Sequence, residues 1–154
     1  MIQRIQTLWL FIVAAMCAVS ICLPLAHIAA GADAYVLGAY GLKNDAGDMV
    51  IRTVYMAAIL DLACLLPLVT IFLYNRRMLQ FRLCVAEMVL LAGAQGIVLI
   101  YCFLSNRIFS EMAFHSIRLH VTVFLPVAAM VFCWLAARGI MRDEIMVRSL
   151  DRIR

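Results

Sequence analysis

Four long apolar runs constrain the fold of this chain more than any other feature of its sequence. They cover approximately residues 6–26, 53–74, 83–104 and 117–137. A helix that crosses the ~30 Å hydrocarbon layer of a bilayer needs about 20 mainly apolar residues. Each run has that length, and a chain with 67% hydrophobic and 14% charged residues is more apolar than soluble domains are. The sequence therefore predicts an all-α membrane protein, a single domain made of four transmembrane helices.

The first apolar run has one alternative interpretation, a cleaved signal peptide, because the positively charged Arg4 precedes it. The apolar core of a signal peptide is only about 7–15 residues long. This run is longer, and the segment "LPLAHIAAGADA" after it offers only a loose small-residue cleavage site. We therefore expect the first run to be a retained helix.

The distribution of basic residues predicts how the helices are oriented, because positive residues near helix ends tend to stay in the cytoplasm. Of the 13 Lys and Arg residues, nine lie in the N-terminus, the connection between the second and third runs, and the C-terminal segment. These nine are Arg4, Arg76, Arg77, Arg82, Arg138, Arg142, Arg148, Arg152 and Arg154. The other two connections hold Lys43, Arg52, Arg107 and Arg118. Both termini are therefore predicted to be cytoplasmic, on a basic face suited to anionic lipid and not to nucleic acid.

The connection between the first and second runs carries a strand pattern of its own. Its turn-rich centre, "KNDAGD", lies between two apolar stretches. The first contains Tyr35, Val36, Leu37 and Tyr40, and the second contains Met49, Val50 and Ile51. Such a pattern predicts a small extracytoplasmic β-hairpin. Two strands alone are marginal in water, so we expect the hairpin to cap the helix ends or to rest on a partner.

Cysteine and histidine do not form a recognisable cofactor site. The six cysteines lie within the predicted spans, and no pair has the C-x-x-C spacing of a dithiol or zinc site. His27, His115 and His120 all map to the outer side, but they lack a helical ligand spacing. No nucleophile is paired with a base. We therefore expect no metal, no cofactor and no catalytic residues.

Asp61, Glu87 and Gln95 are polar residues deep inside the predicted spans, where charge is costly. Asp61 interrupts the apolar stretch "MAAILDLACLLPL", and Glu87 and Gln95 share one stripe of the third run. A charge at the bilayer centre costs ~3 kcal/mol or more, so these groups should face the bundle interior or be protonated. One interpretation is structural, a hydrogen bond from Asp61 to Gln95 or Arg118 that fixes helix order. The other is a proton-relay or substrate site.

The ends of the chain resemble a known family. "MIQRIQT", "NRRMLQFRLC" and "RDEIMVRSLDRIR" are similar to segments of domain-of-unknown-function family 4293, a bacterial family of small four-helix inner-membrane proteins. The resemblance spans essentially the whole chain. It implies a multi-pass protein of the bacterial inner membrane, and it supplies no catalytic residue because the family has no assigned activity.

The C-terminal segment 138–154 is predicted to continue the fourth helix into the cytoplasm as an amphipathic tail. Its apolar residues Met146, Leu150 and Ile153 recur at helical spacing. Either the protein's own N-terminus covers this stripe, or a partner or anionic lipid does. The predicted docking residues are Arg76, Arg77, Arg82, Arg148, Arg152 and Arg154.

The sequence thus favours a non-catalytic scaffold, docking or accessory subunit that works through its basic cytoplasmic face and has a cytoplasmic or membrane protein as its partner. The alternative is a small proton-coupled transporter or channel-like oligomer that uses Asp61, Glu87 and Gln95. An oligomer is compatible with both readings.

Overall fold

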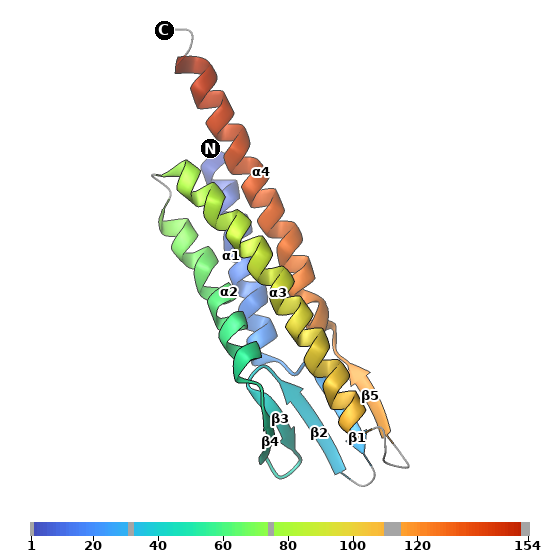
Figure 1. The fold of residues 1–154 in the computed structure, drawn as a ribbon. Coiled ribbons are helices and arrows are strands. Elements are labelled where there is room, and N and C mark those ends of the chain that lie inside the picture. The colour runs from blue at the N-terminus through green and yellow to red at the C-terminus, as the bar shows by residue number, and fades with distance from the viewer. Residues whose placement is uncertain (1, 31–32, 74–75, 110–114, 152–154) are drawn as a thin grey trace.

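Four helices form an elongated bundle in the computed structural model, which describes residues 2–30, 33–73, 76–109 and 115–151 (Figure 1). They are α1 (Ile2–Cys22), α2 (Val54–Phe72), α3 (Arg77–Phe109) and α4 (Leu125–Asp151). Each helix packs against two neighbours, in the cyclic order α1, α2, α3, α4. Four segments are long and apolar enough to cross a membrane, namely Ile5–Cys22, Val54–Phe72, Met78–Phe109 and Val121–Met146. The helices are therefore compatible with a membrane protein.

A five-stranded antiparallel sheet stands at one end of the bundle, so the prediction of an all-α fold with a small hairpin is wrong (Figure 1). Its strands are β1 (Ala26–Ala30), β2 (Asp33–Gly38), β3 (Gly41–Asn44), β4 (Met49–Arg52) and β5 (His115–Leu119). The spatial order is β4-β3-β2-β1-β5. The connection between α1 and α2 supplies four strands, and the connection between α3 and α4 supplies the fifth, which pairs with β1.

Strands β1 and β5 overlap the predicted end of the first helix, near residue 26, and the predicted start of the fourth, near residue 117. The segment 26–30 follows Pro24 and alternates buried and exposed residues, which is the period of a strand and not of a helix. The segment 115–119 lies where the fourth apolar run was expected to begin, but a short 3-10 helix η1 (Val121–Phe124) separates it from α4. Each strand is only five residues long. Such short apolar stretches fit either secondary structure until their pairing partner is known.

The hairpin expected around "KNDAGD" is present as β3 and β4, with Leu42 paired to Ile51. Gly47 in its turn has a φ of 87°, a left-handed conformation that favours glycine. Gly41 lies so close to β4 that a Cβ there would meet the Ile51 carbonyl oxygen at 2.7 Å. Tyr35, Val36 and Leu37 belong to β2, which pairs with β3 and not with β4.

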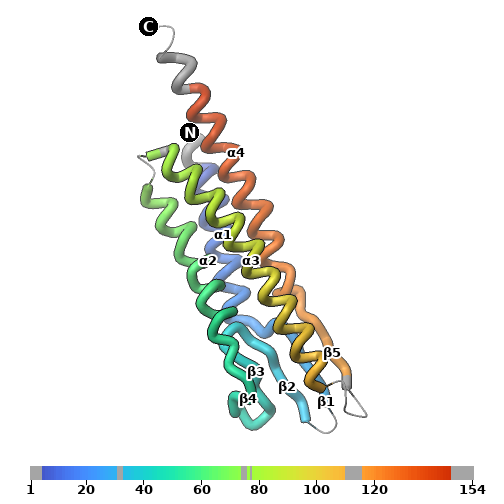
Figure 2. Tube along the Cα trace, in the orientation of Figure 1, coloured from blue at the N-terminus to red at the C-terminus, as the bar shows by residue number. Residues whose placement is uncertain are grey.

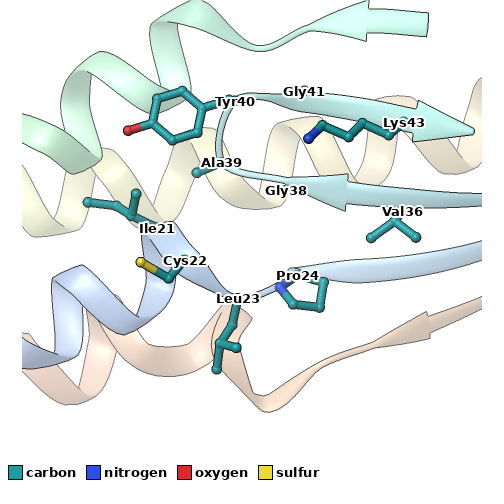
Figure 3. A pocket seen from close by; sticks show the side chains of 10 residues that line it. All are labelled: Ile21, Cys22, Leu23, Pro24, Val36, Gly38, Ala39, Tyr40, Gly41 and Lys43. Carbon is teal, nitrogen blue, oxygen red and sulfur yellow. The ribbon is translucent and has the colours of Figure 1, made fainter. Parts of the chain in front are cut away.

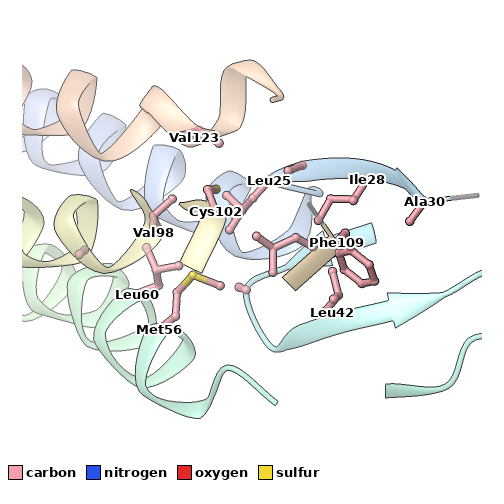
Figure 4. Packing of buried hydrophobic residues seen from close by; sticks show 14 residues of the cluster. Leu25, Ile28, Ala30, Leu42, Met56, Leu60, Val98, Cys102, Phe109 and Val123 are labelled. Carbon is pink, nitrogen blue, oxygen red and sulfur yellow. The ribbon is translucent and has the colours of Figure 1, made fainter. Parts of the chain in front are cut away.

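The sheet and the helices share one hydrophobic core (Figure 4). Helix α3 has 33 residues and is therefore about 50 Å long, well beyond the ~30 Å hydrocarbon layer. Its last turns lie against the sheet, where Phe109 packs on Tyr35 with ring centroids 4.6 Å apart. Ile28, Leu37 and Leu42 of the sheet are almost completely buried in this cluster. The sheet is thus a fixed part of the fold.

Side-chain hydroxyl groups fasten the sheet to the starts of two helices. The Thr53 hydroxyl, just before α2, donates to the Ala39 carbonyl oxygen at 2.7 Å. The Thr122 hydroxyl, in η1, donates to the Pro24 carbonyl oxygen at 2.5 Å. Both threonines are buried, so these bonds satisfy groups that would otherwise lie unpaired away from water.

A second buried cluster fills the half of the bundle farther from the sheet, with Leu10, Leu91 and Ile140 at its centre. The start of α1 and the end of α4 lie at this end, opposite the sheet (Figure 2). Here the Gln6 amide donates to the Asp143 carboxylate at 2.5 Å. Gly139 permits the contact, because a Cβ there would lie 3.1 Å from the Gln6 Cγ.

Candidate functional site

Asp61 lies near the sheet end of the bundle, about two helical turns from the start of α2. The Tyr40 hydroxyl, in the turn between β2 and β3, donates to its two carboxylate oxygens at 3.1 and 3.5 Å. This hydrogen bond, followed by the negative charge of Asp61, raises the pKa of Tyr40 above its ordinary value. The partner differs from Gln95 and Arg118, the two that the sequence suggested. The sequence placed Tyr40 in the predicted hairpin but did not indicate its contact with Asp61, because the two residues are 21 positions apart.

A cavity of about 260 Å³ opens beside this pair (Figure 3). It lies between Cys22 and Leu23, at the end of α1 and just after it, and the β2–β3 hairpin, which contributes Val36, Tyr40 and Lys43. Its walls are mainly apolar, with the phenol, the thiol and the ammonium group as polar features. Such a cavity can hold a small apolar group but offers no set of convergent catalytic groups.

A row of side chains crosses the sheet next to this cavity. Strand register places Arg118, His27, Val36 and Lys43 opposite one another on four adjacent strands. The rings of His27 and His120 lie 4.8 Å apart. Sequence reasoning placed both histidines on the outer side but did not pair them, since it assigned them to helix ends. The side chain of His115 lies outside the described residues.

Glu87 is the most isolated polar group of the bundle. Its side chain is 1% exposed, and neither carboxyl oxygen has a hydrogen-bond partner. The thiol groups of Cys17, Cys64 and Cys133 are close enough to interact with it electrostatically. A carboxyl group in such surroundings carries a high cost when it is charged. Its burial without a partner makes it the strongest candidate for a functional group inside the bundle.

Gln95 lies about two turns further along α3, and its carbonyl oxygen is also buried without a partner. Ser20 of α1 shares this property. The structure therefore does not bring Asp61, Glu87 and Gln95 together through mutual hydrogen bonds. Asp61 is bonded to the sheet end, while the other two lie along α3 inside the bundle.

Two of the predicted docking residues have described side chains, and both lie at the end of the bundle opposite the sheet. Arg76 and Arg82 are exposed there, on either side of the start of α3. The side chains of Arg77 and Arg148, and the residues Arg152 and Arg154, lie outside the described part of the chain. Helix α4 continues past residue 137 to Asp151 and extends beyond the other three helices (Figure 1).

Potential metal ligands are scattered. Across residues 2–30, 33–73, 76–109 and 115–151, no three or more histidine, cysteine or acidic side chains are grouped as a metal ion would require. All six cysteines are free, and Cys22 is the exposed one. Cys133 donates to the Cys84 carbonyl oxygen at 3.4 Å, which is a packing contact in the second cluster.

Comparison with known proteins agrees with the resemblance of the chain ends. None of the curated proteins matches this chain. A family of sequences described as "Domain of unknown function (DUF4293)" matches residues 2–153, which is nearly the whole chain. This description assigns the family no activity. The four helices, the sheet and the extended α4 all fall within the match, and the chain belongs to this DUF4293 family.

Proposed function

We propose that this protein is a docking or accessory subunit of the bacterial inner membrane, with both termini in the cytoplasm and the sheet on the opposite side. The nine-to-four distribution of basic residues supports this orientation. The start of α1, the start of α3 and the end of α4 lie at one end of the bundle, and the nine basic residues lie in or next to these segments in the sequence (Figure 1).

The observation that carries the proposal is the extension of α4 beyond the bundle. The last side-chain contact between α1 and α4 described above is the Gln6–Asp143 hydrogen bond. Beyond it α4 continues through Ile145, which is 60% exposed. An isolated helical segment this short is marginal in water. A partner that covers its apolar side chains would stabilise it.

The charges around this extension suit an acidic partner surface. Arg142 precedes it, and Arg148, Arg152 and Arg154 follow along the sequence. Arg76 and Arg82 are exposed at the same end of the molecule. Basic side chains next to exposed apolar ones are typical of surfaces where apolar contacts supply affinity and charge supplies orientation.

Site-specific photo-crosslinking in living bacteria tests the proposal. A photoreactive phenylalanine replaces Ile145, and in a matched control it replaces Val131, which is 55% exposed but lies in mid-span. Position 145 is expected to give a discrete protein adduct, whereas position 131 is expected to give lipid adducts. The double charge reversal R148E/R152E should remove most of the protein adduct without lowering the thermal stability of the bundle.

Crosslinks from position 145 that reach only lipid, or only this chain itself, would overturn the docking proposal. An adduct unaffected by R148E/R152E would also count against it, since the basic residues would then have no part in binding.

The alternative, a small proton-coupled transporter or channel-like oligomer, is favoured by one observation, the unpartnered carboxyl group of Glu87. Proton carriers in membranes use buried acidic side chains of this kind. Proteoliposomes that contain a pH-sensitive dye would test it. This alternative expects proton entry that is faster than in empty vesicles and is lost in E87Q. Equal rates in protein-containing and empty vesicles would exclude it.

A further inference from the structure

A groove of about 500 Å³ runs between α3 and α4 on the outside of the bundle, near the end that carries both termini. Phe81, Val85 and Met88 line it from α3, and Trp134, Arg138 and Arg142 line it from α4. All six residues belong to segments apolar and long enough to span a membrane. The groove therefore faces lipid if these helices cross the bilayer.

The polar groups of the groove gather toward one end. From Phe81 to Met88 the α3 wall extends about 10 Å and is entirely apolar. On α4 the two arginines lie one turn apart, with Arg142 nearer the end of the helix. The Arg138 guanidinium carbon lies 5.3 Å above the centroid of the Trp134 ring. This cation–π contact holds one positive charge in place at the top of an apolar channel.

We propose that the α3/α4 groove binds one anionic phospholipid of the leaflet next to the termini, with an acyl chain along Val85 and Met88 and the phosphate group on Arg138 and Arg142. Charge complementarity carries this assignment. Arginine forms forked hydrogen bonds that match phosphate geometry. Long arginine side chains near the end of a membrane helix also reach the headgroup region.

The composition of the groove disfavours the other natural occupant, a helix from a second copy of the chain. Helices that pack closely in membranes meet through small residues. Apart from Ala137, the residues that line this groove have large side chains, and Val85 and Trp134 are 40% and 49% exposed. Two arginines at its mouth would also be left without counter-charges by an apolar helix, whereas a lipid phosphate supplies one.

Fluorescence quenching of Trp134 by brominated lipid tests the proposal. The chain has two tryptophans, so the variant W9F leaves Trp134 as the reporter. The W9F protein in lipid nanodiscs is titrated with brominated phosphatidylglycerol or with brominated phosphatidylcholine. Each basic residue at a membrane surface adds roughly a fivefold preference for anionic lipid. For two arginines we therefore expect half-quenching at a mole fraction of phosphatidylglycerol roughly 25-fold lower than that of phosphatidylcholine.

Variants separate the charge from the shape of the groove. R138Q/R142Q in the W9F background should reduce the preference to nearly one, and R138K/R142K should retain part of it. The matched control R52Q removes one positive charge at the opposite end of the molecule, on β4, and should leave the preference unchanged. V85F fills the groove without changing its charge, so the lipid should no longer reach the site and the preference for phosphatidylglycerol should fall to nearly one.

Two results would overturn the proposal. The first is equal quenching by the two lipids in the W9F protein. The second is a preference that survives R138Q/R142Q, because the headgroup would then be recognised elsewhere. Circular dichroism of each variant establishes that its bundle is folded. If R138Q/R142Q does not fold, a loss of preference in V85F supports the groove and an unchanged preference rejects it.

Discussion

The polar side chains at the junction between the sheet and the helices differ from those inside the helical bundle in whether they have hydrogen-bond partners. At the junction, the hydroxyl groups of Thr53, Thr122 and Tyr40 all have hydrogen-bond partners. Among the described residues, the buried side-chain atoms without a partner belong to Ser20, Glu87 and Gln95, and all three lie in helices. The hydrogen bonds of the junction thus stabilise the fold. The unpartnered polar atoms of the bundle lower its stability, because their burial costs free energy that no hydrogen bond offsets.

The comparison also concerns the source of packing energy. Outside the membrane, burying a leucine removes apolar surface from water. Inside it, lipid tails are as apolar as leucine, so that helix association depends on close packing and on polar contacts. If the bundle lies in a membrane as proposed, its two buried clusters contain similar residues that contribute to stability through different terms of the free energy.

The largest predicted effect comes from making the same leucine-to-alanine substitution in each buried cluster and comparing the two losses of stability. Leu37 in the sheet and Leu10 in α1 are both fully buried. L37A is expected to lower the free energy of unfolding by roughly 3 kcal/mol, because both the transfer and the cavity terms are lost. L10A should cost about half as much, because its unfolded helix remains in lipid. Thermal unfolding in detergent, followed by circular dichroism, measures both; equal losses would contradict the distinction.

A smaller effect of opposite sign is expected at Glu87. E87M replaces an unpartnered carboxyl group by an apolar side chain of similar length, and should raise the unfolding free energy by about 1–2 kcal/mol. For a chain of this size that corresponds to a rise in Tm of roughly 2–4 °C per kcal/mol. E87Q remains polar and should gain less. A fall in Tm for E87M would mean that Glu87 has a stabilising partner in the membrane.

The smallest predicted effect concerns the hydrogen bond between Tyr40 and Asp61 at the junction. Y40F should lower Tm only slightly, because Tyr40 is exposed on the surface. Its contribution depends on pH, since only the neutral phenol donates to Asp61. The pKa of Tyr40 is raised, so this contribution is complete below the ordinary tyrosine pKa and disappears as pH rises through the raised value. Ultraviolet titration should show one tyrosine ionising late in the wild type. That tyrosine should ionise earlier in D61N, and an unchanged titration would exclude the hydrogen bond in solution.

The helices could be predicted from the sequence, and the sheet only in part. Runs of about 20 apolar residues determine helices on their own, because length and composition leave no other stable form in a bilayer. The β3/β4 hairpin has a local signal in its turn, "KNDAGD". The pairing of β1 with β5 joins residues such as Ala26 and Leu119, which are far apart in the chain, and no local pattern encodes that contact.

The candidate site residues, like the fold, could be predicted from the sequence only in part. That Glu87 should face the bundle interior follows from the cost of exposing a carboxyl group to lipid. The partner of Asp61 did not follow, because Tyr40 reaches it only when the sheet folds back on α2. Likewise, Arg138 and Arg142 counted as members of a basic face, and the groove beside Trp134 depends on how α3 and α4 pack.

The position of β5 at the edge next to β1 has a consequence for biogenesis. During synthesis β1 to β4 emerge together, after α1, whereas β5 follows only after α3 has been made. Until then, the free edge of β1 presents unpaired backbone groups, which are a template for wrong pairing. If the helices cross a membrane as proposed, the sheet is completed only when the second connection reaches the same side of the membrane as the first. Closure of the sheet would then depend on correct insertion of the last two helices.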